Sequence, residues 1–240
     1  MGKWIADNTN GSLTPDIKIS DSQILSLINT VYFYDEWVDR FDKDLTAPDT
    51  FHLADGTDIT CDFMNMKYGS GHNFSDGDGY LRSALQLKNN GSMVYILPDE
   101  GVNIAELLDS PAKAQEIFTE GKEYAGKVTF KIPKFSFDSS FDLIDALKEL
   151  GIRSAFDEKA DFSGMTDGYA YISGVTQNTH IAINENGVEA SAFSQIQYAG
   201  AMPPDGEAFM ILDRPFIYGI TAPNGTLLFV GVCGNPAVSS

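Results

Sequence analysis

Cysteine and histidine are scarce in this chain, with two cysteines and three histidines among 240 residues. Cys61 and Cys233 lie far apart, each within an apolar strand-like run, which favours buried, inert thiols over a disulfide or a reactive role. The histidines share no metal-ligand spacing with one another or with the cysteines. The segment DGDG at 76–79 begins like a calcium loop, but Tyr80 stands where the third ligand belongs, so a hairpin turn is predicted. We therefore expect neither a metal site nor a cofactor.

Basic residues are also few, because 16 lysines and arginines stand against 34 aspartates and glutamates, for a formal net charge of −18. This charge repels phosphate backbones and anionic lipid, which argues against nucleic acid and membrane partners. No apolar run approaches the roughly 18 residues of a membrane span, and 1–10 lacks the apolar region of a secretory signal. The composition indicates a soluble globular protein.

The chain also lacks a recognisable catalytic set and a linker. Ser163 and Ser173 are the serines considered as nucleophiles, but neither sits in G-x-S-x-G or has a plausible His and Asp set. We therefore expect no enzyme activity. Hydrophobic residues make up 43% of the sequence, enough for a sizeable core, and no linker divides 1–240, so a single domain is predicted.

Hydrophobic periodicity predicts an α+β protein in which strands dominate. Helical patterns cover 102–109, 111–120 and 141–150, and Ser139 or Ser140 is the expected cap of the last helix. Strand patterns cover 23–34, 58–67, 80–88, 92–97, 127–137, 169–184, 207–212, 214–221 and 226–233.

The most informative segment is NENGVEASAFSQIQYAGAMPPDGEAF at 184–209, which follows one of these strands. Side-chain bulk almost disappears at Gly187, Ala190, Ser191 and Ala192. Small residues permit close passage between neighbouring strands and give the segment little reason to fold in one place. The sequence therefore predicts a loop that is able to become a strand.

Strand geometry sends successive side chains of such a loop to opposite faces. One face receives Val188, Ala190, Ala192 and Ser194, which are small or moderate and uncharged. The other face includes Phe193, the one bulky residue, where bulk is tolerated. The loop is therefore compatible with insertion into a sheet.

Glu185, Gly187 and Glu189, with the small residues after them, resemble the reactive-loop hinge of the serpins, the metastable protease inhibitors. The resemblance recurs in order along nearly the whole chain, which makes the match specific. The other matching blocks are ILSLINTVYFYDEW at 24–37, KIPKF at 131–135, LGIRSAF at 150–156, ADFSGM at 160–165, DRPFIYGI at 213–220 and LLFVGVCGNP at 227–236.

The resemblance implies an α+β serpin-like fold, with a large mixed β-sheet, further β-sheets and a few helices. The segment 3–13 resembles the end of a helix well inside the family's fold. We therefore expect the chain to be an N-terminally truncated domain that holds about the C-terminal two-thirds, without the N-terminal helices.

The resemblance also implies a function: an extracellular inhibitor that traps a serine protease on a reactive loop at about 185–207. Counting seventeen positions from Glu185, as the family does, places the cleaved bond at Ala201–Met202, with Met202 as the alternative cleavage residue. A small alanine and the lack of basic residues in the loop favour elastase-like or subtilisin-like proteases. The implied hinge consists of Glu185, Gly187, Val188, Glu189, Ala190, Ser191 and Ala192.

Two further groups of residues match family positions that control opening of the large sheet. Trp37, Lys134 and Glu185 match the breach, where the loop first enters, with a Lys–Glu ion pair under a Trp. Asn29 matches a polar residue of the central shutter, where Gln177 replaces the usual histidine. Because glutamine also donates and accepts hydrogen bonds, the shutter is expected in altered form.

Two alternatives stay open at this point. One is a non-inhibitory serpin that acts as a binding module, and the other is an inactive truncated fragment. The intact parent is expected to be a monomer, whereas loop-to-sheet association is the alternative for the fragment.

Overall fold

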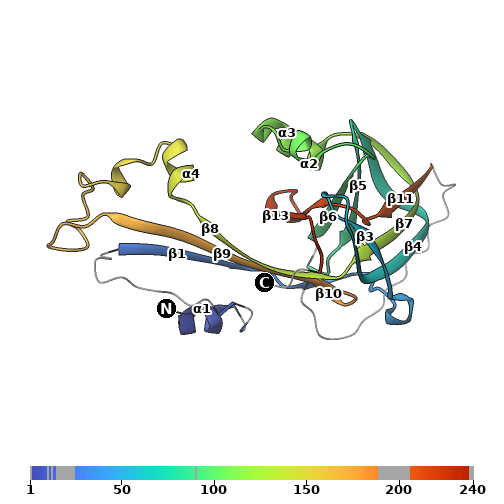
Figure 1. Cartoon of the computed structure of the whole chain (residues 1–240), viewed down its shortest axis with the longest axis horizontal. Coiled ribbons are helices and arrows are strands. Elements are labelled where there is room, and N and C mark those ends of the chain that lie inside the picture. The colour runs from blue at the N-terminus through green and yellow to red at the C-terminus, as the bar shows by residue number, and fades with distance from the viewer. Residues whose placement is uncertain are drawn as a thin grey trace. The chain divides into compact units, whose positions relative to one another are not determined.

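The structure is a computed structural model that describes residues 2–9, 11, 13–14, 25–89, 91–188 and 206–237. The chain forms two compact units (Figure 1). The first unit comprises Met1–Phe33 and Phe137–Ile181 together with Ser240, and the second comprises Tyr34–Ser136 and Ala182–Ser239. No helix in these described ranges is long and apolar enough to cross a membrane.

Strands dominate both units. The helices are α1 (Gly2–Asn8), α2 (Ile104–Leu107), α3 (Pro111–Thr119) and α4 (Ile144–Glu149), with 3-10 turns at Lys43–Leu45 and Ser154–Phe156. The strands are β1 (Leu25–Tyr32), β2 (Asp35–Glu36), β3 (Ala47–His52), β4 (Asp58–Gly77), β5 (Tyr80–Gln86), β6 (Ser92–Pro98), β7 (Lys122–Pro133), β8 (Phe135–Asp142), β9 (Ile172–Asn184), β10 (Gly187–Val188), β11 (Glu207–Ile211), β12 (Phe216–Thr221) and β13 (Leu227–Cys233).

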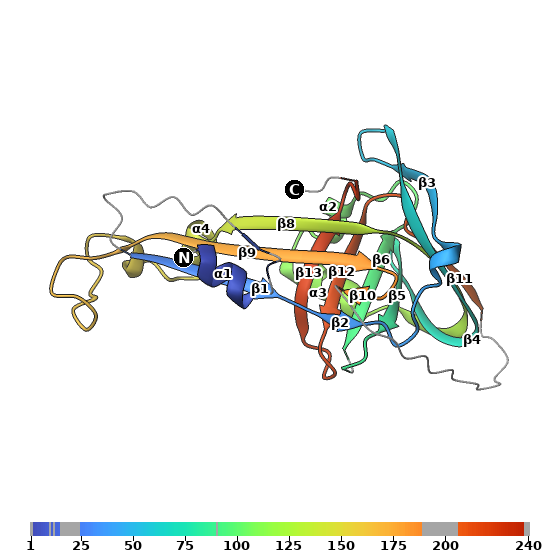
Figure 2. The same ribbon diagram turned by 90° about the horizontal axis from the view of Figure 1, so that it is seen from below.

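The first unit is built on the parallel pair β1 and β9, with β8 on the other side of β9 (Figure 2). The β1–β9 register is continuous from Ser26 opposite Gly174 to Tyr32 opposite His180. His180 also contacts Asp138 in β8 through its ring Nδ1, so β9 is joined to both neighbours.

Residues 139–142 were predicted as the start of a helix, and that prediction was wrong. The strand β8 continues to Asp142, because the alternation of FSFDSSFD extends the strand pattern past the expected caps at Ser139 and Ser140. Helix α4 begins at Ile144, whose N–H donates to Asp142 Oδ1 at 3.0 Å.

The second unit contains an eight-stranded sheet in the order β11-β7-β4-β5-β6-β12-β13, with β3 paired to β4. Strand β4 is much longer than the predicted 58–67, because it resumes its pairing with β7 after a bulge between Tyr68 and His72. The small residues at 69–71 interrupt the alternation in the sequence and concealed this continuity. The hairpin turn predicted at 76–79 is confirmed, since Gly77 pairs with Tyr80 and Gly79 has a φ of +83°.

Helices α2 and α3 cover one face of this sheet and complete a buried cluster with strand residues. Its members are Tyr80, Val94, Ile96, Leu107, Ile117 and Ile217. Helix α3 packs closely on β12. A Cβ at Gly219 in β12 would lie 2.5 Å from the ring of Phe118 in α3.

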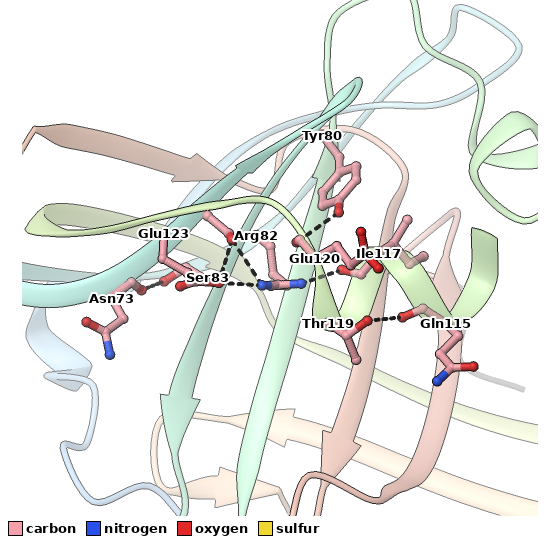
Figure 3. A network of polar contacts seen from close by, with 10 residues as sticks. Asn73, Tyr80, Arg82, Ser83, Gln115, Ile117, Thr119, Glu120 and Glu123 are labelled. Atoms are coloured by element: carbon pink, nitrogen blue, oxygen red, sulfur yellow. Dashed lines mark hydrogen bonds and ion pairs between the residues drawn. The ribbon is translucent and has the colours of Figure 1, made fainter. Parts of the chain in front are cut away.

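Arg82 in β5 ties the end of α3 to the sheet (Figure 3). Its guanidinium donates to the Ile117 carbonyl at 3.2 Å, to Ser75 Oγ at 3.0 Å and to Glu123 Oε1 at 2.6 Å. A cation at a helix C-terminus stabilises the unpaired carbonyls and the negative end of the helix dipole. Tyr80 adds a second link by donating to the Glu120 carbonyl at 3.1 Å.

Both cysteines are free thiols. Cys233 is buried, as expected, whereas Cys61 is only half-buried. Burial raises the pKa of the Cys61 thiol to about 11, and the nearby carboxylates of Asp62 and Asp49 act in the same direction. Both effects disfavour the thiolate.

Candidate functional site

The site forms where β9 ends and the chain reverses into β10. The turn at Glu185–Asn186 is closed by the Asn184 side chain, whose Oδ1 accepts from the Asn186 N–H at 2.9 Å. Beyond it, β10 runs antiparallel to β9, with Gly187 opposite Asn184. Gly187 and Val188 therefore run back along the end of β9.

Strand β10 lies between β9 and β2, with hydrogen-bonded neighbours on both sides. Glycine is required at 187, because a Cβ there would lie 2.4 Å from the Asp35 carbonyl oxygen and 2.6 Å from Glu36 Cα. Val188 is completely buried. Two of the hinge residues, Gly187 and Val188, are thus already part of a sheet.

The register of β10 matches that of the strands beside it. Gly187 pairs with Glu36 in β2 and with Asn184 in β9, and these two partners are 148 positions apart in the chain. In the β1–β9 ladder, the partners Tyr32 and His180 are also 148 positions apart. The partners on either side of β10 and the partners in the β1–β9 ladder therefore have the same offset in sequence.

Glu185 is the centre of the polar contacts at the turn. Its carboxylate, 6% exposed as a residue, accepts from Lys134 Nζ at 3.0 Å and from Thr46 Oγ1 at 3.0 Å. Its backbone carbonyl accepts from the Phe41 N–H at 3.1 Å. Burial opposes ionisation of Glu185, but hydrogen bonds from its own backbone, Lys134 and Thr46 outweigh it, so the pKa of Glu185 is lowered.

Trp37 closes the site over the same turn. Its residual exposure is zero, and its indole Nε1 donates to the Asn184 carbonyl at 2.9 Å. Its backbone N–H donates to the Asn186 carbonyl at 3.1 Å. The structure thus places Trp37, Lys134 and Glu185, the breach residues inferred from the sequence, around one turn.

Asn29 and Gln177, the inferred shutter pair, lie in the first unit as direct partners in the β1–β9 ladder. Paired residues of adjacent strands project to the same face. Asn29 is exposed and Gln177 is half-buried.

The remaining inferred site residues lie outside the part of the chain that the structure describes. They are Glu189, Ala190, Ser191 and Ala192 of the hinge, and Ala201 and Met202 at the reactive bond.

Sequence reasoning did not assign Thr46, Asp35 or Glu36 to the site. Thr46 reaches Glu185 across 139 positions of sequence, and no local pattern marks such a partner. The adjacent acidic residues at 35–36 before a tryptophan were the one available signal, because two carboxylates inside an otherwise apolar run need partners when buried.

The fold agrees with comparisons to known proteins. A family model described as Serpin (serine protease inhibitor) matches residues 1–236. The chain belongs to the serpin family. Its α+β architecture of mixed sheets with few helices is the serpin fold, as predicted.

Individual relatives of this serpin show how much of the family's length is present. Serpin-Z2A of Triticum aestivum is 32% identical over 254 aligned residues, which cover 98% of this chain and 63% of the relative. The solved structure of tengpin, a thermophilic serpin in the native state, has a TM-score of 0.81 at 28% identity, covering 96% of this chain and 61% of tengpin. The chain therefore spans less than two thirds of the length of these relatives.

A third solved structure has the same fold at lower sequence identity. Human thyroxine-binding globulin complexed with its hormone has a TM-score of 0.80 at 24% identity, with 98% of this chain and 63% of that protein covered. At this identity the likeness concerns the fold alone. The family in general is one of protease inhibitors rather than catalysts.

Proposed function

We propose that this chain carries the sheet and reactive loop of a serpin that traps a serine protease of elastase-like or subtilisin-like preference. The observation that supports this best is β10, which lies between β9 and β2 in the register of the β1–β9 ladder. A loop extended from Val188 can enter between β1 and β9 without either strand sliding along the other. The new strand would make two ladders in place of one.

In this proposal the protease catalyses cleavage of the loop, and insertion of the cleaved loop into the serpin sheet provides the free energy for trapping. The protease serine attacks the carbonyl carbon of Ala201, the bond to the Met202 nitrogen breaks, and the new amine leaves with that nitrogen's proton and one from the serine. The acyl ester joins Ala201 to the enzyme. Insertion of the loop then carries the enzyme away and distorts it before water cleaves the ester.

The choice of protease follows from the loop sequence. Ala201 suits a shallow primary pocket, and 184–209 contains no lysine or arginine for a trypsin-like pocket. Pro203 and Pro204 disfavour cleavage at their own nitrogens.

The test is incubation with pancreatic elastase and with subtilisin, with trypsin as the control enzyme. It is run on the 240-residue chain and on the longest natural chain that contains it. We expect a covalent complex that survives detergent, and a released C-terminal peptide that begins at Met202 by mass spectrometry. A peptide that begins several residues away contradicts the assigned bond. Cleavage of the longest natural chain without a complex contradicts trapping and favours the binding-module alternative. A complex from that chain and none from the 240-residue chain favours the inactive-fragment alternative.

A pair of variants tests the insertion itself. Ala190→Arg is expected to convert the inhibitor into a substrate, because alternation places residue 190 on the same face as the buried Val188, where insertion would force an unpaired arginine into the sheet. Phe193→Arg is the matched control, since alternation places residue 193 on the opposite face. The ratio of complex to cleaved product is measured by gel densitometry, and equal effects of both changes would show that the alternation argument is wrong.

A further inference from the structure

Strand β2 has only two residues, so its pairing with β10 cannot by itself determine where it lies. Its other edge is attached to the connection between β5 and β6. The Lys88 N–H donates to the Glu36 carbonyl at 2.9 Å, and the Val38 N–H donates to the Gln86 carbonyl at 2.9 Å. Trp37 and Leu87 form an antiparallel bridge between the same segments.

Both side chains of β2 are carboxylates and both are buried, with 3% of Asp35 and 9% of Glu36 exposed. Asp35 accepts from the backbone N–H of Asn89 at 3.2 Å and from its side-chain amide at 3.0 Å. Glu36 accepts from Arg40 Nη2 at 2.7 Å and from Lys88 Nζ. Two adjacent buried carboxylates in a chain of net charge −18 are strongly disfavoured unless such partners are present.

The ion-paired Glu36 is also the residue against which the hinge packs. Gly187 is its partner in the β2–β10 ladder, and no side chain fits between them. Any shift of β2 therefore changes the position of β10. In this group the side chain of Glu36 is 11% exposed, that of Arg40 is 16% exposed and that of Lys88 is 31% exposed.

We propose that Glu36, held by Lys88 and Arg40, is a positioning residue that fixes β2 as the stationary edge for the hinge strand β10. This inference rests on the proposed function, because the position of β10 matters for inhibition only if the loop inserts. It assigns a role in inhibition to Lys88, which lies on the β5–β6 connection outside the loop and the hinge.

Hydrogen exchange on the 240-residue chain, with no protease present, tests the positioning directly. We expect Lys88→Met to accelerate exchange of the Gly187 and Val188 amides by about tenfold, the effect of losing one charged hydrogen bond at a buried carboxylate. Lys88→Arg is expected to restore the slow rate. Lys67→Met, which removes the same charge at an exposed position of β4, is the control and is expected to have no effect.

The outcomes separate this inference from the proposed function. Unchanged exchange at residues 187–188 in Lys88→Met overturns the positioning role, and so does an equal acceleration in β12, which would mean a general loss of stability. A second arm compares Lys88→Met with the unmodified protein in the protease assay, where we expect a smaller complex-to-cleavage ratio. If no protease forms a complex with the unmodified protein, the proposed function fails, while the exchange result still decides the role of Glu36.

Discussion

His72 is a partly buried histidine in β4 whose ring stacks on Tyr68, with centroids 4.0 Å apart, and meets Phe130 edge-on at 5.2 Å. Its Nε2 is buried and has no hydrogen-bond partner among the described residues. Burial lowers the pKa of His72, against the smaller opposing effects of the Ala84 backbone and the Asp39 carboxylate. The folded protein therefore favours the neutral ring.

A histidine with a lowered pKa makes stability depend on pH. The stability that neutral His72 contributes is fully present above the unfolded pKa of about 6.5, and it is lost as pH falls through the lower folded pKa. His72→Phe removes this loss. We expect the variant to gain on the unmodified protein as pH falls below about 6.5, by about 1.4 kcal/mol for each tenfold difference in proton affinity between the unfolded and folded states.

Urea unfolding followed by tryptophan fluorescence at several pH values measures this gain. His52→Phe is the control, because the His52 side chain is 56% exposed and pairs with Asp58 at the surface. Parallel pH profiles for His72→Phe and the unmodified protein would contradict the expectation.

At the residue scale, the resemblance to serpins named Trp37, Lys134 and Glu185, and in the structure these three surround one turn. Two partners were out of reach for sequence reasoning: Thr46, which donates to Glu185, and Lys88, which donates to Glu36. Each contact joins segments far apart in the chain, and a hydroxyl or carboxylate has no periodicity that would reveal its partner.

At the scale of elements, alternation predicted most of the strands, because a pleated strand with one buried face shows a period of two in the sequence, but it missed β3 and did not separate β8 from β7. The failures have physical causes. The bulge after Tyr68 resets the alternation inside β4. The apolar residues of 135–141 fit the strand β8. The helical pattern that follows them also includes Phe141, so the predicted helix began too early and overlapped the end of β8.

The attachment of α3 to the sheet is expected to depend on Arg82. Arg82→Met leaves the Ile117 carbonyl and Ser75 hydroxyl without this donor and removes the charge opposite Glu123. We expect a loss of about 1–3 kcal/mol in unfolding free energy, since the buried Ile117 carbonyl loses its charged donor, whereas the Glu123 side chain is 62% exposed and can be solvated. Denaturant titration measures the loss, and hydrogen exchange localises it to 111–119.

Lys113→Met is the matched control for Arg82. Lys113 also carries an ion pair in α3, with Asp109 at 3.0 Å, but both side chains are about half exposed. Exposed pairs contribute under about 1 kcal/mol, so little change is expected. Similar losses in the two variants would show that Arg82 contributes no more than a surface pair.

At the scale of the whole molecule, a strong negative charge coexists with exposed apolar surface. Strand β13 is the last strand of its sheet within the described residues. Alternate residues on one of its faces, Leu228, Val230 and Val232, are 52%, 52% and 45% exposed. An edge strand with an apolar face is a site for pairing with another chain, whereas net charge of one sign opposes association.

We therefore expect the 240-residue chain to self-associate, and to do so more strongly as salt is raised, because salt screens the charge of −18. Val230→Lys is expected to reduce the association. Leu45→Lys is the control, since Leu45 is also exposed, at 56%, but lies in the 3-10 turn Lys43–Leu45 and not in β13. Sedimentation velocity at low and high salt measures the association, and a monomer under both conditions would contradict it.

Insertion of the loop in the register shared by β10 and the β1–β9 ladder would resemble strand displacement between nucleic acids, in which an incoming strand replaces an existing one pair by pair. Two residues, Gly187 and Val188, are already engaged, as a toehold is. If the register continues, the next two residues reach positions beyond the end of the β1–β9 ladder, and only the third competes with the pair Tyr32–His180. From there each incoming residue would exchange for one existing pair. In such a process the length of the toehold sets the rate of initiation and leaves the final free energy unchanged. Under the proposed function, loss of the pairs at 187–188 would therefore slow the trapping of a protease more than it would destabilise the trapped complex.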